Sequence, residues 1–325
     1  MRFRLLKLFM TAISAVMLSS CSCPNHYSFY DEAPPLPEIL VPSLPKIALV
    51  LGGGGAKGLA HLGVIQELTE AGIVFDMIVG CSAGSMVGAL FSDHLNTECI
   101  WDTFAPVKSQ SILDICIWNS RYGLSQGKAF YDILQKNLSA TTFEQLKIPL
   151  YVVATDLCTG ELCTFGSGPL VPAIVASCSI PIVFIPVQHE GRILVDGGVV
   201  DPVPVRVARD LGAQCIIAVD IGGGLATDFP TNLLGVGKRS AEITLLWQAE
   251  GCVEGAEIVI RPEMRGFSCF DDKHKQEIFE AGRLAARTAL PEIQKILSET
   301  NFVTSSKEPW LQIPAPCYSS PSCRR

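Results

Sequence analysis

The pentapeptide Gly80-Cys81-Ser82-Ala83-Gly84 contains the first residues of this sequence that could do chemistry. It fits G-x-S-x-G and lies between an apolar run at 77–79 and a segment with helical spacing at 85–91. A strand, a sharp turn and a helix in that order form a nucleophile elbow, which exposes a serine hydroxyl. Because a hydroxyl is a weak nucleophile without a base, a catalytic Ser82 needs a partner elsewhere in the chain. Many structural turns also match the pattern, so both interpretations stay open here.

A run of glycines at residues 52–55 raises a second chemical possibility. Residues 53–58 match G-x-G-x-x-G, the fingerprint of a dinucleotide-binding turn. The acid that would bind the ribose, Asp76, precedes the second apolar run instead of following it. A P-loop fails as well, because Gly58 follows Lys57 where serine or threonine is required. A nucleotide site is therefore the weaker interpretation, and it leaves the serine motif unexplained.

The same glycines could instead form an oxyanion hole. Backbone N–H groups at the start of a helix can point at a developing negative charge, and glycine lets a substrate approach closely. This interpretation assigns oxyanion amides to Gly53, Gly54 and Gly55. Lys57 would add positive charge, directed at the oxyanion or at a lipid phosphate; the alternative is an ordinary solvated lysine.

A carboxylate is the candidate base. Asp196-Gly197-Gly198 ends the apolar run at 193–195, and the carboxyl end of a strand is where α/β proteins place their chemistry. A plain Asp-Gly turn is the alternative. A histidine could also serve, as in a serine triad. We expect His61 to pack under the glycine loop, and His189 to precede a hairpin turn.

The elements that must position these residues alternate along the chain. Apolar runs of strand length occupy 47–51, 77–79, 150–154, 162–165, 193–195, 215–220 and 257–261, and helical spacing occupies 58–71, 85–91 and 274–298. Unbroken apolar strands separated by helices predict a mostly parallel sheet covered on both faces.

Composition excludes several classes of protein. The chain has 325 residues, of which 48% are hydrophobic, which rules out global disorder. A net charge of −7 without a basic stripe argues against nucleic-acid binding. The 13 cysteines lack the paired spacing of a zinc site, so we expect no metal. Those in or beside apolar runs are expected to be small buried hydrophobes: Cys81, Cys158, Cys178 and Cys215.

The N-terminal sequence has the pattern of a signal peptide that is removed by processing. A basic start and an apolar stretch at 8–18, too short to span a membrane, lead into Leu18-Ser19-Ser20-Cys21. This end resembles a bacterial lipobox, which predicts a lipoprotein signal peptide at 1–20 and acylation of Cys21. Lipid on Cys21 would attach the protein to a membrane of the bacterial cell envelope. An ordinary signal peptide and an uncleaved anchor are the alternatives.

Three further segments complete the predicted organisation. Residues 21–45 are rich in proline and predict an extended tether. Residues 46–298 form the predicted domain. Residues 299–325 predict a disordered tail, with Cys317 and Cys323 as a candidate disulfide pair.

Taken in order, G-G-G-G-A-K-G, G-C-S-A-G and D-G-G resemble the motifs of the patatin-like phospholipases, in their bacterial branch. The likeness extends to segments such as "AIVASCSIPIVFIPV" and "LVDGGVVDPVPVRVARDLGAQCIIAVDI" and covers about residues 46–297. The resemblance implies a three-layer α/β/α fold with a mostly parallel central sheet. It also implies a dyad of Ser82 as nucleophile and Asp196 as base, with oxyanion amides from Gly53, Gly54 and Gly55. Lys57 takes the family's Arg/Lys position.

The activity that the resemblance implies is hydrolysis of acyl esters in phospholipids, lysophospholipids or neutral lipids, without metal or cofactor. An envelope lipoprotein that uses the fold only for binding is the alternative. The sequence departs from the family at Cys81, where threonine is frequent, at Ile182, where glycine is usual, and at Asp201, where asparagine is common. These differences bear on substrate preference. The apolar stretch 100–122 is either a lid or acyl pocket, or core packing.

Overall fold

The computed structural model describes residues 27–28, 34–36, 39, 47–115, 121–225 and 229–299. The predicted signal peptide, Cys21, the candidate pair Cys317 and Cys323, and all of the predicted tail except Glu299 lie outside these residues. In the described part, no helix is long and apolar enough to cross a membrane.

An eight-stranded sheet forms the centre of the domain, in the order β10-β9-β1-β2-β4-β8-β7, with β5 paired to β4. Strands β10, β9, β1, β2 and β4 are parallel, whereas β5, β7 and β8 run antiparallel to their neighbours. The strands are β1 (Ile47–Leu51), β2 (Met77–Cys81), β4 (Leu150–Asp156), β5 (Leu162–Phe165), β7 (Val187–His189), β8 (Arg192–Asp196), β9 (Cys215–Val219) and β10 (Ile258–Ile260). A separate two-stranded ribbon pairs β3 (Gly123–Ser125) with β6 (Ile182–Phe184).

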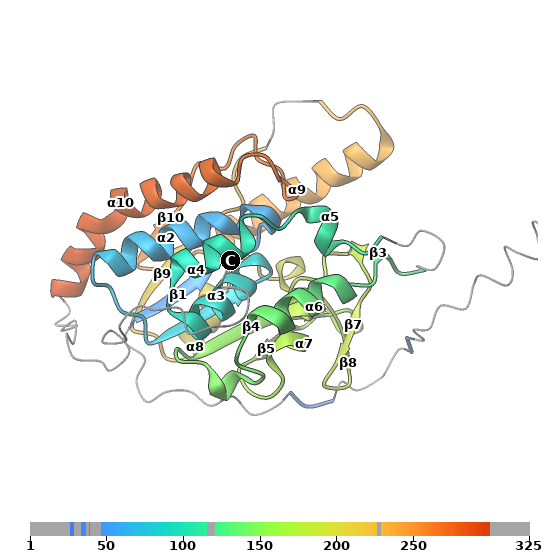
Figure 1. The fold of residues 1–325 in the computed structure, drawn as a ribbon, viewed down its shortest axis with the longest axis horizontal. Helices are drawn as coiled ribbons and strands as arrows, with labels where there is room; N and C mark the ends of the chain where they lie inside the picture. Colours follow the sequence, from blue (N-terminus) through green and yellow to red (C-terminus); the bar gives the residue numbers. More distant parts are fainter. Residues whose placement is uncertain are drawn as a thin grey trace, which may run out of the picture.

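Helices cover both faces of the sheet, so the predicted three-layer α/β/α fold with a mostly parallel sheet is confirmed (Figure 1). The helices are α2 (Leu59–Glu70), α3 (Ala83–His94), α4 (Thr97–Phe104), α5 (Ser109–Ile112), α6 (Lys128–Asn137), α7 (Leu170–Ser177), α8 (Val205–Asp210), α9 (Leu233–Cys252) and α10 (Lys275–Glu299). Three short 3-10 turns occupy Gly55–Gly58, Phe143–Gln145 and Gly197–Val199.

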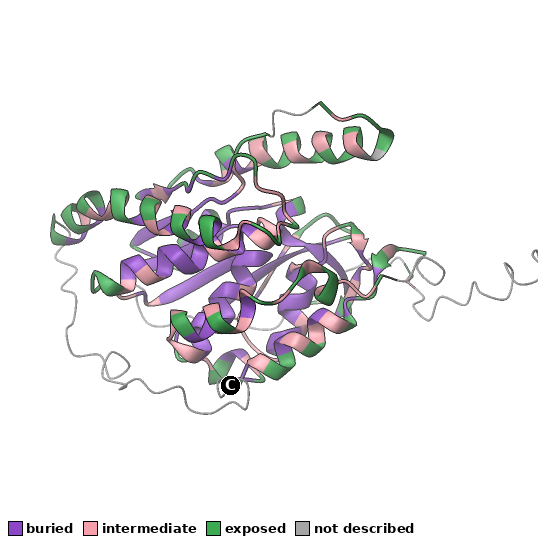
Figure 2. Cartoon of the chain, turned by 45° about the horizontal axis from the view of Figure 1, so that its top comes forward, coloured by how far each residue is buried: buried purple, intermediate pink, exposed green. Residues whose placement is uncertain are grey.

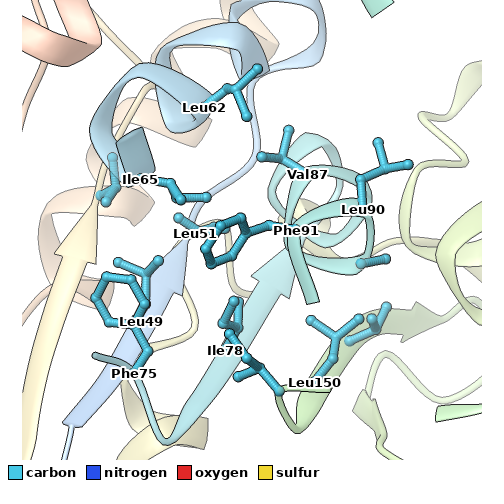
Figure 3. Close-up of a cluster of buried hydrophobic side chains, with 14 of the residues drawn as sticks. Leu49, Leu51, Leu62, Ile65, Phe75, Ile78, Val87, Leu90, Phe91 and Leu150 are labelled. Carbon is cyan, nitrogen blue, oxygen red and sulfur yellow. The ribbon is translucent and has the colours of Figure 1, made fainter. Parts of the chain in front are cut away.

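Alternation along the strands builds a core on each face. Leu49 and Leu51 of β1 face α2 and α3, where they pack with Leu62, Ile65 and Phe91 (Figure 3). Ala48 and Val50 of the same strand face α8 and the end of α9. Since successive side chains of a strand point to opposite faces, a strand buried on both sides must be apolar throughout. The sheet is accordingly buried at its centre (Figure 2).

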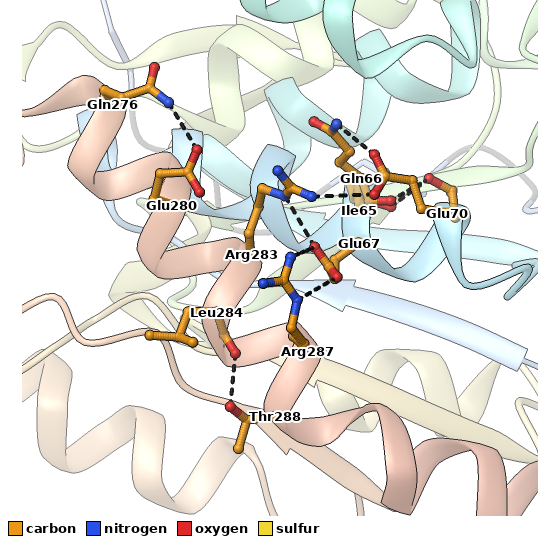
Figure 4. Close-up of polar contacts among 11 residues, drawn as sticks. Ile65, Gln66, Glu67, Glu70, Gln276, Glu280, Arg283, Leu284, Arg287 and Thr288 are labelled. Carbon is orange, nitrogen blue, oxygen red and sulfur yellow. Dashed lines mark hydrogen bonds and ion pairs between the residues drawn. The ribbon is translucent and has the colours of Figure 1, made fainter.

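Helices α2 and α10 lie side by side and touch through their backbones. A Cβ on Gly63 would lie 2.1 Å from the Phe279 carbonyl oxygen, and one on Gly282 would lie 2.1 Å from that of Ala60. Only glycine permits this distance. Ion pairs cross the same contact, where Glu67 meets Arg283 and Arg287 (Figure 4).

The stretch 100–122 contributes to the core through α4. Ile100 and Phe104 are buried, and Trp101 packs against Phe279 with ring centroids 4.7 Å apart. Core packing is therefore the correct interpretation for these α4 residues. Further along, Ile115 is 57% exposed, and residues 116–120 lie outside the described part.

The described residues of the proline-rich segment contact the domain. The Tyr27 hydroxyl donates to the Pro186 carbonyl oxygen at 2.5 Å. The Arg192 guanidinium donates to the Pro34 carbonyl oxygen at 2.7 and 3.0 Å, and Leu36 packs against the core. Composition predicts an extended spacer, but at these positions the chain is docked on the surface of the domain.

Candidate active site

Ser82 occupies the turn between β2 and α3. Its backbone angles, φ 52° and ψ −121°, lie where a residue with a side chain is strained. The two flanking glycines are sterically required, because a Cβ on Gly80 would lie 2.6 Å from the Ser85 Cα and one on Gly84 2.1 Å from the Leu51 carbonyl oxygen. The strand-turn-helix geometry predicted from G-x-S-x-G is therefore present.

Sheet register brings Asp196 to this serine. Residues 152–153 of β4 pair with both β2 and β5, and residues 154–155 pair with both β5 and β8. Strands β2 and β8 must therefore share the edge of β4 opposite β5. Cys81 pairs with Val153, and Asp196 pairs with Ala154. The carboxyl ends of β2 and β8 thus meet head to head, which places the two side chains together.

The two side chains form a direct hydrogen bond. The Ser82 hydroxyl donates to Asp196 Oδ2 at 2.6 Å, and the Gly198 N–H donates to Asp196 Oδ1 at 2.8 Å. Ser82 is 5% exposed and Asp196 6% exposed. The aspartate backbone is fixed as well, since its N–H donates to Ser179 O at 2.9 Å and Thr155 Oγ1 donates to its carbonyl at 3.0 Å.

Burial sets the proton affinity of this carboxylate. It raises the pKa of Asp196 to about 6, while the hydrogen bonds from Ser82 and Gly198 work in the opposite direction. Within the described part of the chain, no lysine or arginine forms an ion pair with Asp196 to offset the burial. A carboxylate with a pKa near neutrality, held on a hydroxyl, is suited to accept that hydroxyl's proton.

The glycine loop differs in two details from its predicted role. The Gly53 N–H donates to the Pro202 carbonyl oxygen at 2.9 Å, so this amide is occupied. Lys57 is buried, and its ammonium donates to the Gly222 carbonyl oxygen. Lys57 is thus neither a solvated lysine nor directed at the site in this structure. Its donor instead stabilises the loop after β9.

The amides of Gly54 and Gly55 remain as candidate oxyanion donors. Neither donates a hydrogen bond among the residues that the structure describes. Gly55 has φ +61°, and a Cβ there would lie 2.5 Å from the Cys269 carbonyl oxygen, so this position requires glycine. The loop also lies against the candidate nucleophile Ser82, since a Cβ on Gly53 would lie 3.4 Å from the Ser82 Cβ.

Neither candidate histidine bonds to the serine. His61 is fully buried under the glycine loop, with Nε2 2.7 Å from the Gly52 carbonyl oxygen. Burial lowers the pKa of His61 to about 4, so the ring is neutral. His189 ends β7, and the turn of Glu190 and Gly191 follows it with positive φ at both residues. Both expectations for these histidines are confirmed.

Asp76, the acid that would bind the ribose of a dinucleotide, lies away from the glycine loop. The Asp76 carboxylate accepts the Ile47 N–H at 2.8 Å, at the start of β1. The glycine loop follows the opposite end of that strand. In the described residues, no group of three or more histidine, cysteine, aspartate or glutamate side chains could hold a metal ion.

Ser177 and Ser85 support the elbow and belong to none of the three sequence motifs. The Ser177 hydroxyl accepts the Ser82 N–H at 2.9 Å, and the Ser85 hydroxyl donates to the Ser82 carbonyl at 2.6 Å. Two thiols flank the dyad, with Cys81 Sγ 4.0 Å from Asp196 Oδ1 and Cys178 Sγ 3.7 Å from Ser85 Oγ. Both Ser177 and Cys178 lie in "AIVASCSIPIVFIPV", one of the segments that resemble the patatin-like phospholipases, and this resemblance is the signal that could have identified them.

The α/β/α fold, with a serine and an aspartate paired at a strand-turn-helix elbow, is patatin-like. Residues 49–209, just under half of the chain, match the family model "Patatin-like phospholipase".

The chain is also similar to known proteins over part of its length. An uncharacterized NTE family protein from Mycobacterium tuberculosis is 38% identical over 186 residues, which are 57% of this chain and 51% of that protein. Patatin-like phospholipase domain-containing protein 6 from Homo sapiens is 31% identical over 193 residues, 57% of this chain and 14% of that protein. The chain thus spans about half the length of the first relative and less of the second. The crystal structure of VipD from Legionella pneumophila has a similar fold, with a TM-score of 0.54 at 14% identity over 78% of this chain and 68% of VipD.

Proposed function

We propose that this chain hydrolyses acyl esters of membrane lipids through Ser82 and Asp196. The observation that carries the proposal is the 2.6 Å hydrogen bond between the two side chains at a strained elbow. The patatin-like phospholipase domain supports lipid as the substrate class.

The mechanism follows from the hydrogen bonds. Asp196 accepts the Ser82 proton as the hydroxyl attacks the ester carbonyl, and the resulting oxyanion faces the free amides of Gly54 and Gly55. The tetrahedral intermediate collapses when Asp196 returns the proton to the departing alcohol, leaving an acyl-serine. Water, deprotonated by the same carboxylate, then attacks the acyl carbon. Asp196 returns this proton to Ser82 Oγ as the bond between the acyl carbon and Oγ breaks, which releases the fatty acid. Gly198 holds Asp196 in position through both steps.

The test is covalent labelling together with turnover. A fluorophosphonate probe should label the wild-type chain and Ser298→Ala, a distant exposed serine variant, but not Ser82→Ala. Hydrolysis of a panel of phospholipid, lysophospholipid and neutral-lipid esters should follow the label. Unlabelled folded wild type without turnover would support the alternative, a lipoprotein that uses the fold as a binding surface. Full turnover by Ser82→Ala would refute the dyad.

We also propose that a lipid on Cys21 attaches the chain to the bacterial cell envelope. The support is the sequence Leu18-Ser19-Ser20-Cys21 after a short apolar stretch. Mass spectrometry of the mature N-terminal peptide should find an acylated Cys21, and Cys21→Ala should lose the modification. An N-terminus elsewhere in the mature chain would contradict this.

A further inference from the structure

Helix α9 carries apolar side chains on the side that faces solvent. The exposed fractions of four residues are large: Leu233 86%, Val236 48%, Ile243 39% and Trp247 78%. Their spacings of three, seven and four residues place them on one face of the helix, here called the α9 stripe. The helix instead packs on the sheet through Ala249 and Val253, which lie on the opposite side.

The members of the α9 stripe are uncharged, and Gly237, Ser240 and Thr244 share their face of the helix. Two charged residues lie at the edge of this face, and both are paired. Arg239, one turn from Val236 and Ile243, is only 23% exposed and lies 3.4 Å from Glu242. Glu250, one turn after Trp247, pairs with Arg261 at 2.9 Å. A surface helix of a globular protein normally buries such a stripe, so an outward one indicates a binding surface.

The stripe is fastened to the candidate active site. Gln248, next to Trp247, donates to the carbonyl oxygens of Val199 and Val200 at 3.1 and 2.8 Å. These valines follow Asp196 by only three and four residues, and Val199 is 43% exposed. Whatever binds the stripe therefore lies beside the loop that carries the proposed base.

A second apolar surface lies on the β3–β6 ribbon. Tyr122, Leu124 and Ile182 are 37%, 45% and 76% exposed and form what we call the ribbon rim. Figures 1 and 2 place this ribbon and the N-terminal half of α9 toward the same end of the molecule. The docked N-terminal segment reaches the same rim, because the Tyr27 ring packs edge-on against Tyr122 at 4.8 Å. Tyr27 follows Cys21 by six positions, which a fully extended chain spans in about 20 Å.

We propose that the α9 stripe and the ribbon rim dock together on the surface of a lipid bilayer. The inference rests on the proposed function, because a lipid substrate must come from that surface. Tryptophan and uncharged aliphatic side chains suit the membrane interface. A second copy of the chain is a poorer occupant, since a stable protein interface uses about 20–30 residues a side and the stripe offers four.

Quenching by brominated lipid tests the position of Trp247. The full chain is reconstituted with phosphatidylcholine vesicles whose acyl chains carry bromine. Wild-type fluorescence should be quenched more strongly than that of Trp247→Phe. Because the stripe is uncharged, the difference should persist in roughly 0.5 M salt, which screens exposed charges within a few ångströms. This readout reports where Trp247 lies even if a lipid anchor already holds the chain on the vesicle.

Paired leucine variants test the consequence for turnover. Leu233→Asp should slow hydrolysis of vesicle phospholipid about tenfold or more, because an exposed leucine loses its burial in lipid. Its hydrolysis of a soluble short-chain ester should be unchanged. The matched control is Leu284→Asp, a 64% exposed leucine on α10, which should change neither rate.

The outcomes separate this proposal from the proposed function. Trp247-dependent quenching without any ester hydrolysis would retain the docking surface and refute the enzyme. Hydrolysis with equal quenching of wild type and Trp247→Phe would overturn the docking surface. A Trp247-dependent dimer in sedimentation, without quenching, would also overturn it and assign the stripe to a second copy.

Discussion

Two buried carboxylates in different regions of this domain have opposite properties. Glu67 of α2 is 8% exposed and Asp196 of β8 is 6% exposed. Glu67 accepts hydrogen bonds from Arg287 at 2.9 Å and from Arg283 at 3.1 Å, and these partners lower its pKa, Arg287 foremost (Figure 4). Asp196 has only neutral donors, and burial raises its pKa to about 6.

Burial acts to raise the pKa of both carboxylates, and the contrast shows that charged partners reverse this effect at Glu67. Guanidinium groups hold Glu67 ionised, so it fastens α2 to α10 and has no proton affinity to use near neutral pH. A hydroxyl and an amide leave Asp196 close to its ionisation point. The structural site satisfies its charge, and the candidate active site leaves it uncompensated.

The largest expected effect is the loss of hydrolysis when Asp196, the carboxylate with the raised pKa, is replaced. Asp196→Asn keeps an acceptor for Gly198 and offers a donor to Ser82, but removes the base. We expect hydrolysis to fall by about 10⁴-fold, as when a serine hydrolase loses a triad carboxylate. The free energy of unfolding at pH 7 should rise, since a costly buried charge is gone. Initial rates and urea unfolding measure both, and retained activity would contradict the proposed role.

The free energy of unfolding should depend on pH with opposite signs for the two carboxylates. The folded state raises the pKa of Asp196 from 3.8 to about 6, so its protonated form stabilises the fold. This contribution, about 3 kcal/mol, is present below pH 4 and is lost as the pH rises through 6. Glu67 has a lowered pKa, so its contribution is present above its ordinary pKa of 4.5 and is lost on acidification.

The same ionisation predicts the activity profile. Because the base must be ionised, kcat/KM for a soluble ester should rise with pH and level off above about 6. Comparing wild type, Asp196→Asn and Glu67→Gln in urea across this range separates the two stability slopes. A flat kcat/KM between pH 5 and 7 would argue against Asp196 as the base.

Glu67→Gln removes the other carboxylate of the comparison, the one that pairs with two arginines. It leaves Arg283 and Arg287 without their carboxylate, at an expected cost of about 2 kcal/mol in the free energy of unfolding. The cost is below that of a fully buried pair because the Arg287 side chain is 58% exposed. Activity at temperatures where the variant is folded should match wild type. If Glu67→Gln lost kcat at temperatures where it is fully folded, the α2–α10 contact would be shown to support the site.

The smallest expected effect is at Ile182. Its φ of +75° is strained for a β-branched residue, and its side chain is 76% exposed, so little burial compensates. Ile182→Gly should raise the free energy of unfolding by up to about 1 kcal/mol, because relief of strain exceeds the added chain entropy of glycine. Thermal unfolding measures the change, and a destabilised variant would contradict it.

Short-range pattern predicted the parts of the fold that depend on the local sequence. Residues 47–51 and 162–165 form strands with the bounds expected from their apolar runs, and the elbow follows from G-x-S-x-G. The α9 stripe had no such signal, because its apolar residues face solvent and do not report a core. Ribbon strands β3 and β6 are too short for periodicity to show.

Within the candidate site, the residue types were predictable and the pairings were not. Ser82 and Asp196 are 114 residues apart, and only the register of β4 with β2 and β8 brings them into contact. The partners of Gly53 and Lys57, which are Pro202 and Gly222, come from distant loops. Hydrogen bonds of this kind are decided by tertiary structure, so a sequence motif cannot separate an occupied amide from a free one.

The thiols of Cys81 and Cys178, which flank the dyad, bear on the design of covalent inhibitors. Burial raises the pKa of both, so neither supplies a thiolate, although thiols are ordinarily the stronger nucleophiles. Electrophiles that react with thiolates should therefore leave Cys81 and Cys178 unmodified, and those that react with a hydroxyl next to a base should select Ser82. The site would then select its electrophile because burial keeps both thiols protonated, even though two sulfur atoms lie beside the serine.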